Sequence, residues 1–144
     1  MYGVLLSEGA KKQEAVDAFN KAIELKPEFP EAYSNLANTL WLMGLFEEAK
    51  AACNTAIKIK PDYADVYINL GSAHYALKEI DEAIAVWEKA LELNPNHPNA
   101  FINLGNAYRD KGELAKAKEH CLKALEIWPD SPEALVNLGN VYND

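Results

Sequence analysis

Asparagine recurs at a fixed interval along the chain, and its carboxamide is well suited to hold another polypeptide. One row of residues is spaced by 34, and a second row with one serine follows three residues behind it: Asn35, Asn69, Asn103 and Asn137, then Asn38, Ser72, Asn106 and Asn140. Helical residues three apart lie on one face. A carboxamide can bond both the N–H and the C=O groups of an extended peptide. The rows therefore predict a peptide-binding surface. The open alternative is that these asparagines bond one 34-residue segment of the chain to the next.

Larger side chains with the same spacing lie one turn further along this face: Trp41, Tyr75 and Arg109. Aromatic residues and arginine are the types that most often contribute binding energy at protein interfaces. Acidic residues stand near the start of the same segments: Glu31, Asp65 and Glu133. This rim favours a neutral or basic peptide with apolar anchors. The alternatives are helix–helix packing for the aromatics and a solvated helix start for the acids.

The histidines and cysteines, which often carry catalysis or bind metals, show no spacing in the sequence that would place them in one site. His74, His97 and His120 occupy three different positions of the repeat, and no pair has metal-ligand spacing. Cys53 and Cys121 lie two repeats apart, roughly 20 Å at 8–10 Å per packed helix, whereas a disulfide needs Cα atoms within about 7 Å. We therefore expect two small core cysteines, no enzymatic activity, no metal and no cofactor.

The whole chain follows a period of 34 residues. Prolines, alanines and leucines recur at that step: Pro27, Pro61, Pro95 and Pro129; Ala15, Ala49, Ala83 and Ala117; Leu36, Leu70, Leu104 and Leu138. Each unit predicts two helices, because apolar residues recur three or four apart, separated by a turn and closed by a proline. Gly44, Lys78 and Gly112 stand at the turn, and Gly9 falls one position earlier in the same register. Small residues let the helix axes approach closely.

These columns resemble the tetratricopeptide repeat over the entire chain. The best-preserved unit carries the motif as Phe101-x2-Leu104-Gly105-x2-Tyr108, followed by Ala117, Cys121, Ala124 and Pro129. The resemblance implies an all-α, right-handed α-solenoid of antiparallel helix pairs whose first helices line a concave groove. It also implies a protein–protein interaction module that binds a peptide segment there. The asparagine rows are similar to those of the repeat array of O-linked N-acetylglucosamine transferases.

The repeat register divides the chain into a single array. We expect a partial repeat over 1–29, full repeats over 30–63, 64–97 and 98–131, and the first helix of a further repeat over 132–144. Met1 falls within a first helix, so the array is predicted to be a piece of a longer one. Two alternative functions follow: copies that stack end to end through uncapped termini, or a substrate-recruiting segment of a larger enzyme such as a glycosyltransferase.

Net charge and hydropathy exclude some classes of binding partner. The formal net charge is −8 at pH 7, which disfavours both nucleic acid and anionic membrane surfaces. No run of apolar residues is long enough to span a membrane, and the first residues lack the pattern of a signal peptide. A protein or peptide partner and a cytoplasmic location, as the default, are the resulting predictions.

Overall fold

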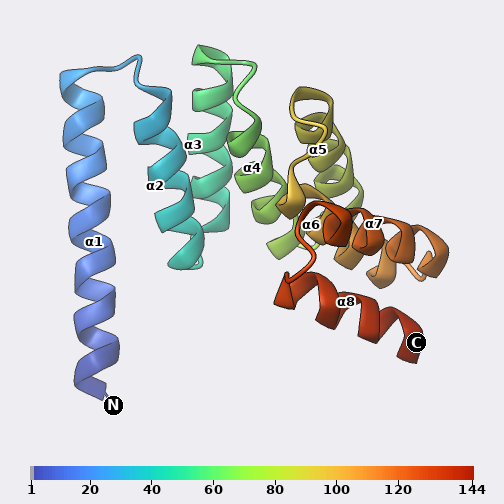
Figure 1. Ribbon diagram of the computed structural model, residues 1–144. Helices are drawn as coiled ribbons and strands as arrows, with labels where there is room; N and C mark the ends of the chain where they lie inside the picture. The colour runs from blue at the N-terminus through green and yellow to red at the C-terminus, as the bar shows by residue number, and fades with distance from the viewer. Residues whose placement is uncertain (1) are drawn as a thin grey trace.

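The computed structural model describes the backbone of residues 2–144 and the side chains of residues 8–144. This part of the chain forms eight α-helices and no strand (Figure 1). The all-helical class is the one that the sequence predicts. Their bounds are α1 Tyr2–Leu25, α2 Pro30–Leu42, α3 Phe46–Ile59, α4 Ala64–Ala76, α5 Ile80–Leu93, α6 Pro98–Asp110, α7 Leu114–Ile127 and α8 Pro132–Asn143. None of these helices combines the length and apolar character needed to cross a bilayer.

The helices stack as antiparallel pairs in chain order (Figure 1). Each packs against its neighbours in sequence, and α2, α4, α6 and α8, the inner helices, also contact one another in succession. The outer helices α1, α3, α5 and α7 make no contact with each other in the described chain. The array therefore curves with its inner helices on the concave side. The all-α solenoid is confirmed.

A left-handed residue closes each inner helix that is followed by an outer one. Gly44 and Gly112 have φ values of 79° and 77°, and Lys78 takes the same place with a φ of 67°. After Lys78, the Glu79 N–H donates to the His74 carbonyl at 3.0 Å. This is the bond of a Schellman turn, which satisfies carbonyls that the helix leaves free and points the next helix back along the first. The turn thus sets the antiparallel pair.

Small residues bring the two helices of a pair together. A Cβ built on Gly71 would fall 2.3 Å from Nε1 of Trp87, and one on Gly105 would fall 2.9 Å from Sγ of Cys121. Both cysteines, Cys53 and Cys121, are free and have no exposed surface, so their prediction as core residues is confirmed. Burial raises the pKa of the Cys53 thiol to about 12.

The beginning of the chain departs from the repeat pattern. The register places residues 1–8 in an inner helix and Gly9 at a turn, but α1 runs unbroken from Tyr2 through Gly9 to Leu25. Elsewhere the turn is stabilised by an inner helix packed on its outer helix, whereas α1 contacts only α2. Without that packing, continued helical hydrogen bonding is the more stable choice. Met1 lies outside the described residues.

Candidate peptide-binding groove

Three cavities lie in series along the inner helices. A cavity of about 100 Å³ opens between α2 and α4, and its lining is Asn38, Trp41, Asn69 and Ser72. The next, of about 240 Å³, reaches from α2 to α6 and is lined by Trp41, Ser72, Tyr75, Trp87, Asn103 and Asn106. The last, of about 420 Å³, lies between α6 and α8 and is lined by Ile102, Asn103, Asn106, Pro132, Glu133, Val136 and Asn137. Shared residues join the three into one groove.

Most of the predicted site residues line this groove. Asn38, Trp41, Asn69, Ser72, Tyr75, Asn103, Asn106 and Asn137 all do so. Asn35, Arg109 and Asn140 line none of the three cavities. Arg109 Nε donates to the carboxylate of Asp144 instead. The structure therefore brings together two rows of amides but leaves their outer members aside.

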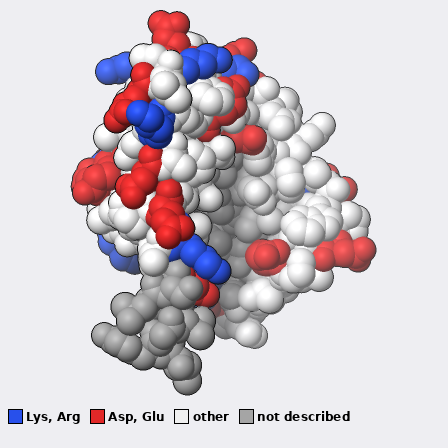
Figure 2. All heavy atoms as spheres, turned by 90° about the vertical axis from the view of Figure 1, so that its left-hand side faces the viewer, with Lys and Arg blue, Asp and Glu red and all other residues white. Residues whose placement is uncertain are grey.

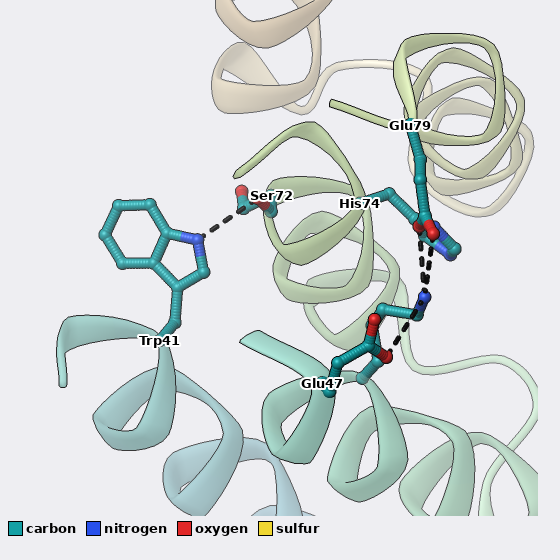
Figure 3. A network of polar contacts seen from close by, with 6 residues as sticks. Trp41, Glu47, Ser72, His74 and Glu79 are labelled. Carbon is teal, nitrogen blue, oxygen red and sulfur yellow. Dashed lines mark hydrogen bonds and ion pairs between the residues drawn. The ribbon is translucent and has the colours of Figure 1, made fainter. Parts of the chain in front are cut away.

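The α2–α4 end of the groove is held by hydrogen bonds between repeats. Asn69 Nδ2 donates to the Ser34 hydroxyl at 3.3 Å and, more weakly, to the Ser34 carbonyl at 3.4 Å. Trp41 Nε1 donates to the Ser72 carbonyl at 3.1 Å (Figure 3). Trp41 nevertheless remains 37% exposed. At this end the asparagine ties repeats together, while the indole ring stays open to a partner.

The hydrogen bonds in the middle of the groove differ from those at the α2–α4 end. The Ile68 carbonyl accepts from Trp87 Nε1 at 3.2 Å and from Ser72 Oγ at 3.0 Å. Ile68 also replaces the hydroxyl that Ser34 offers one repeat earlier. Among the described residues, the side chains of Asn103 and Asn106 form no hydrogen bond, although both are partly buried. Their donors and acceptors are available to a ligand.

Asn137 closes the groove with an unpaired amide. Its side chain is 9% exposed, and its Nδ2 has no hydrogen-bond partner in the described part of the chain. The equivalent residue Asn69 reaches Ser34, but the residue that faces Asn137 from the preceding repeat is Ile102, which lacks a hydroxyl. A buried donor without a partner destabilises a protein by about 1–3 kcal/mol. Its Nδ2 is itself buried, so a ligand oxygen would reach it only after the side chain turns toward the cavity.

Tyr75 is fixed as a donor at the mid-groove wall. Its hydroxyl bonds the Asp110 carboxylate on α6. Burial and that carboxylate raise the pKa of Tyr75 to about 12. The phenol therefore stays protonated over the physiological range, and its ring packs on Trp87 with centroids 5.8 Å apart.

Four lining residues were not among the predicted site residues: Ile102, Pro132 and Val136 in the α6–α8 cavity and, in the middle cavity, Trp87. Trp87 belongs to the outer helix α5, is 2% exposed, and reaches the inner face past Gly71. The signal was present in the sequence, because a bulky residue at this position of an outer helix requires a glycine opposite it. The repeats that carry Cys53 or Cys121 at this position place no side chain there that could reach the groove.

A polar cluster on the far side of α4 joins α3 to the turn before α5. Lys50 Nζ lies 3.0 Å from Glu79 and 3.5 Å from Glu47, and His74 Nδ1 lies 2.5 Å from Glu79 (Figure 3). Lys50 and His74 hold the pKa of Glu79 below its ordinary value. Within residues 8–144 no group of three His, Cys, Asp or Glu side chains is placed to share a metal ion.

Family models describe most of this architecture. One for the TPR repeat matches residues 11–44 and 71–109, and one for the tetratricopeptide repeat matches residues 30–63 and 98–131. A search of curated protein sequences finds no match.

Solved structures with the same fold include three repeat proteins. MamA is 27% identical, with a TM-score of 0.83 over 95% of this chain and 80% of that one. TTC0263, a thermophilic TPR protein of Thermus thermophilus, is also 27% identical, with a TM-score of 0.83 over 99% of this chain and 78% of that one. The first TPR domain of human RPAP3 is 23% identical, with a TM-score of 0.78 over 81% of this chain and 92% of that one; at that identity the likeness shows the fold alone.

Proposed function

Because this chain belongs to the tetratricopeptide repeat family, whose domains bind protein partners, we propose that its groove binds an extended peptide segment through main-chain hydrogen bonds. Proteins built on such repeats are typically non-enzymatic scaffolds, and the proposal assigns the groove no chemical step. The resemblance of the asparagine rows to those of O-linked N-acetylglucosamine transferases supports an amide-lined site for main chain.

The observation that carries the proposal is the pair of amides of Asn103 and Asn106, which line two of the cavities and form no hydrogen bond within the described chain. Asn137, whose buried Nδ2 is also unpaired, lines one of the same cavities. Carboxamides at successive inner helices offer both donors and acceptors, which is what an extended main chain needs. These amides therefore support peptide contact at α6 and α8, with an inter-repeat tie at Asn69.

The lining also favours a particular kind of peptide. Ile102, Val136 and the exposed Trp41 ring offer apolar contacts, and the exposed Glu133 adds a negative charge to the lining of the α6–α8 cavity. A neutral or basic segment with apolar anchors fits this surface. Inner helices 8–10 Å apart give a path of roughly 27 Å across four of them, which about eight extended residues would span.

The test begins with a random-peptide display selection against the whole chain. Binding of an enriched peptide is then measured by fluorescence anisotropy for the chain and for Asn103→Ala and Asn137→Ala. We expect each variant to bind several-fold more weakly and the double variant about tenfold more weakly, the worth of one or two hydrogen bonds. Asn137→Ala should at the same time leave the melting temperature unchanged or raised, because it removes the unpaired donor.

Asn54→Ala is the matched control, because Asn54 is an exposed asparagine on the outer helix α3. It should bind the peptide as the unaltered chain does. Selected peptides that bind all the variants equally, or a selection that enriches none, would contradict the proposal.

A further inference from the structure

The last inner helix has no outer helix packed on it. On α6, the residues that face α7 are closed off, with Phe101 and Tyr108 each 8% exposed. The residues one repeat later on α8 are Leu135 and Tyr142, which are 51% and 63% exposed. The same seven-residue spacing, two helical turns, places them on one side of α8. This side of α8 therefore carries the apolar residues that an outer helix covers on α6, but no described helix covers them.

A glycine on this side of α8 fits the same interpretation. Gly105 on α6 is crowded, since a Cβ there would fall 2.9 Å from Cys121 Sγ on α7. Gly139 holds the equivalent place on α8, and a Cβ there would meet nothing within 4 Å. The close approach that this position serves elsewhere is therefore unused on α8.

The first helix shows the converse. On the outer helix α7, Ala117, Cys121 and Ala124 pack on α6 and have no exposed surface. Their equivalents on α1 are Ala15, Phe19 and Ala22, which are only partly buried, Phe19 by packing on one side against the core under α2. Ala18 beside them is exposed. The other side of α1 is occupied, because Val16 is buried against α2. Thus α1 has the character of an outer helix without an inner one.

We propose that α8 of one copy packs against α1 of a second copy, so that the two helices complete one repeat across the interface. The register follows from the repeats within the chain. Gly139 would lie opposite the partner copy's Phe19, as Gly71 lies opposite Trp87. Two alanines of α1 would flank the phenylalanine and let the helix axes approach closely.

Charge and length are compatible with this pairing. In an antiparallel pair the end of the inner helix adjoins the start of the outer one, which brings Asp144, already paired with Arg109 of its own chain, near Lys11 and Lys12 of the second copy. Helix α1 has 24 residues where the other outer helices have 14, so its extra turns run past the end of the docked α8. Charges of both signs are spread over the side of the molecule that α1 presents (Figure 2).

The contact joins two different surfaces, so it does not close on itself. Heterologous contacts of this kind generate open rows of copies. Each added copy would extend the solenoid and its concave groove. The interface uses neither the asparagine rows nor the cavities between the inner helices, so assembly is independent of peptide binding.

The test measures mass by sedimentation velocity for the whole chain, from about 1 μM to about 1 mM, the range that covers weak self-association. A salt concentration of about 0.15 M or above limits repulsion between copies that each carry a net charge of −8. We expect the mean mass to rise steadily with concentration. Leu135→Glu on α8 and Ala18→Glu on α1 should each abolish this rise.

Mixing the two variants separates this arrangement from others. Each variant keeps one intact surface, so an equimolar mixture should give a dimer that grows no further. Leu42→Glu is the matched control, because Leu42 is also a leucine that is 51% exposed but lies on neither surface. It should associate as the unaltered chain does, and circular dichroism should show the same helicity for all variants.

Three results would overturn the proposal. A chain that is monomeric at every concentration would mean that the α8 surface is left for another occupant, such as a following segment of a longer chain. Self-association of Ala18→Glu alone would mean that two α8 surfaces pair symmetrically. Loss of association in Leu42→Glu would place the contact elsewhere.

Discussion

Gly71 on α4 lies directly against the indole of Trp87 on α5, so closely that a Cβ on Gly71 would fall 2.3 Å from Nε1. That contact lets Nε1 reach the Ile68 carbonyl at 3.2 Å and places the ring in the wall of the groove. In the preceding repeat, Ala37 and Cys53 hold the same two positions. Each pair fills the same space between an inner and an outer helix: a large side chain faces glycine in one repeat, and a smaller one faces alanine in the other.

Gly71→Ala should therefore destabilise the chain. Overpacking of a close contact costs about 1–3 kcal/mol, which the higher helix propensity of alanine offsets by only about 1 kcal/mol. Urea denaturation followed by circular dichroism measures the difference. Gly9→Ala is the control, since a Cβ there meets nothing within 4 Å; it should be neutral or stabilising. Equal effects of both changes would show that Trp87 yields without strain.

Lys78→Gly should stabilise the chain. Lys78 is the only non-glycine residue with positive φ in the described chain, at 67°, and this conformation costs an L-residue about 1–2 kcal/mol. Glycine loses about 0.5–1 kcal/mol more backbone entropy on folding, so a net gain of up to about 1.5 kcal/mol is expected. The reverse change at the equivalent turn, Gly112→Lys, should destabilise. A lower melting temperature for Lys78→Gly would contradict the argument.

Acid should weaken the contact between α3 and the α4–α5 turn. Lys50 and His74 lower the pKa of Glu79 from its ordinary 4.5, so the unfolded chain binds this proton more readily than the folded chain. The stabilisation is present above the unfolded value and is lost as the pH falls through the folded one. Thermal melts of Glu79→Gln and the unaltered chain should differ at neutral pH and converge as the pH falls progressively below 4.5.

Glu48→Gln provides the comparison for that titration, because Glu48 is exposed and forms no ion pair with a described residue. Its melting temperature should follow that of the unaltered chain at every pH. A Glu79→Gln difference that stays constant into acid would assign its effect to packing and not to charge.

The cysteines should report opening of individual repeats. Burial raises the pKa of Cys53 from 9.0 to about 12 and raises that of Cys121 as well, which lowers the reactive thiolate of Cys53 about a thousandfold. Labelling by a chromogenic disulfide should thus be slow in the folded chain and rapid in denaturant. Cys53→Ser and Cys121→Ser resolve the two sites. Immediate labelling of both thiols without denaturant would show that the pairs open readily.

The period of 34 residues predicts the helices and the curve of the solenoid, because each unit repeats one packing problem. It predicts the two amide rows for the same reason. It does not predict how each amide is used: Asn69 and Asn137 share a repeat position, but one faces Ser34 and the other faces Ile102. That difference depends on a residue 35 positions earlier. The unbroken α1 was missed because the pattern assumes a neighbour on both sides.

The inner helices contact one another whereas the outer helices of the described chain do not, so the array can lengthen elastically by straightening. Pulling its ends apart must stretch the inner contacts first, including those from Trp41 to Ser72 and from Tyr75 to Asp110. A peptide that is hydrogen-bonded to successive inner helices would add links between them, and these links would resist the extension. If the groove binds a peptide as proposed, its occupancy would stiffen the array, and tension on the chain would change the spacing between the amides that the peptide contacts.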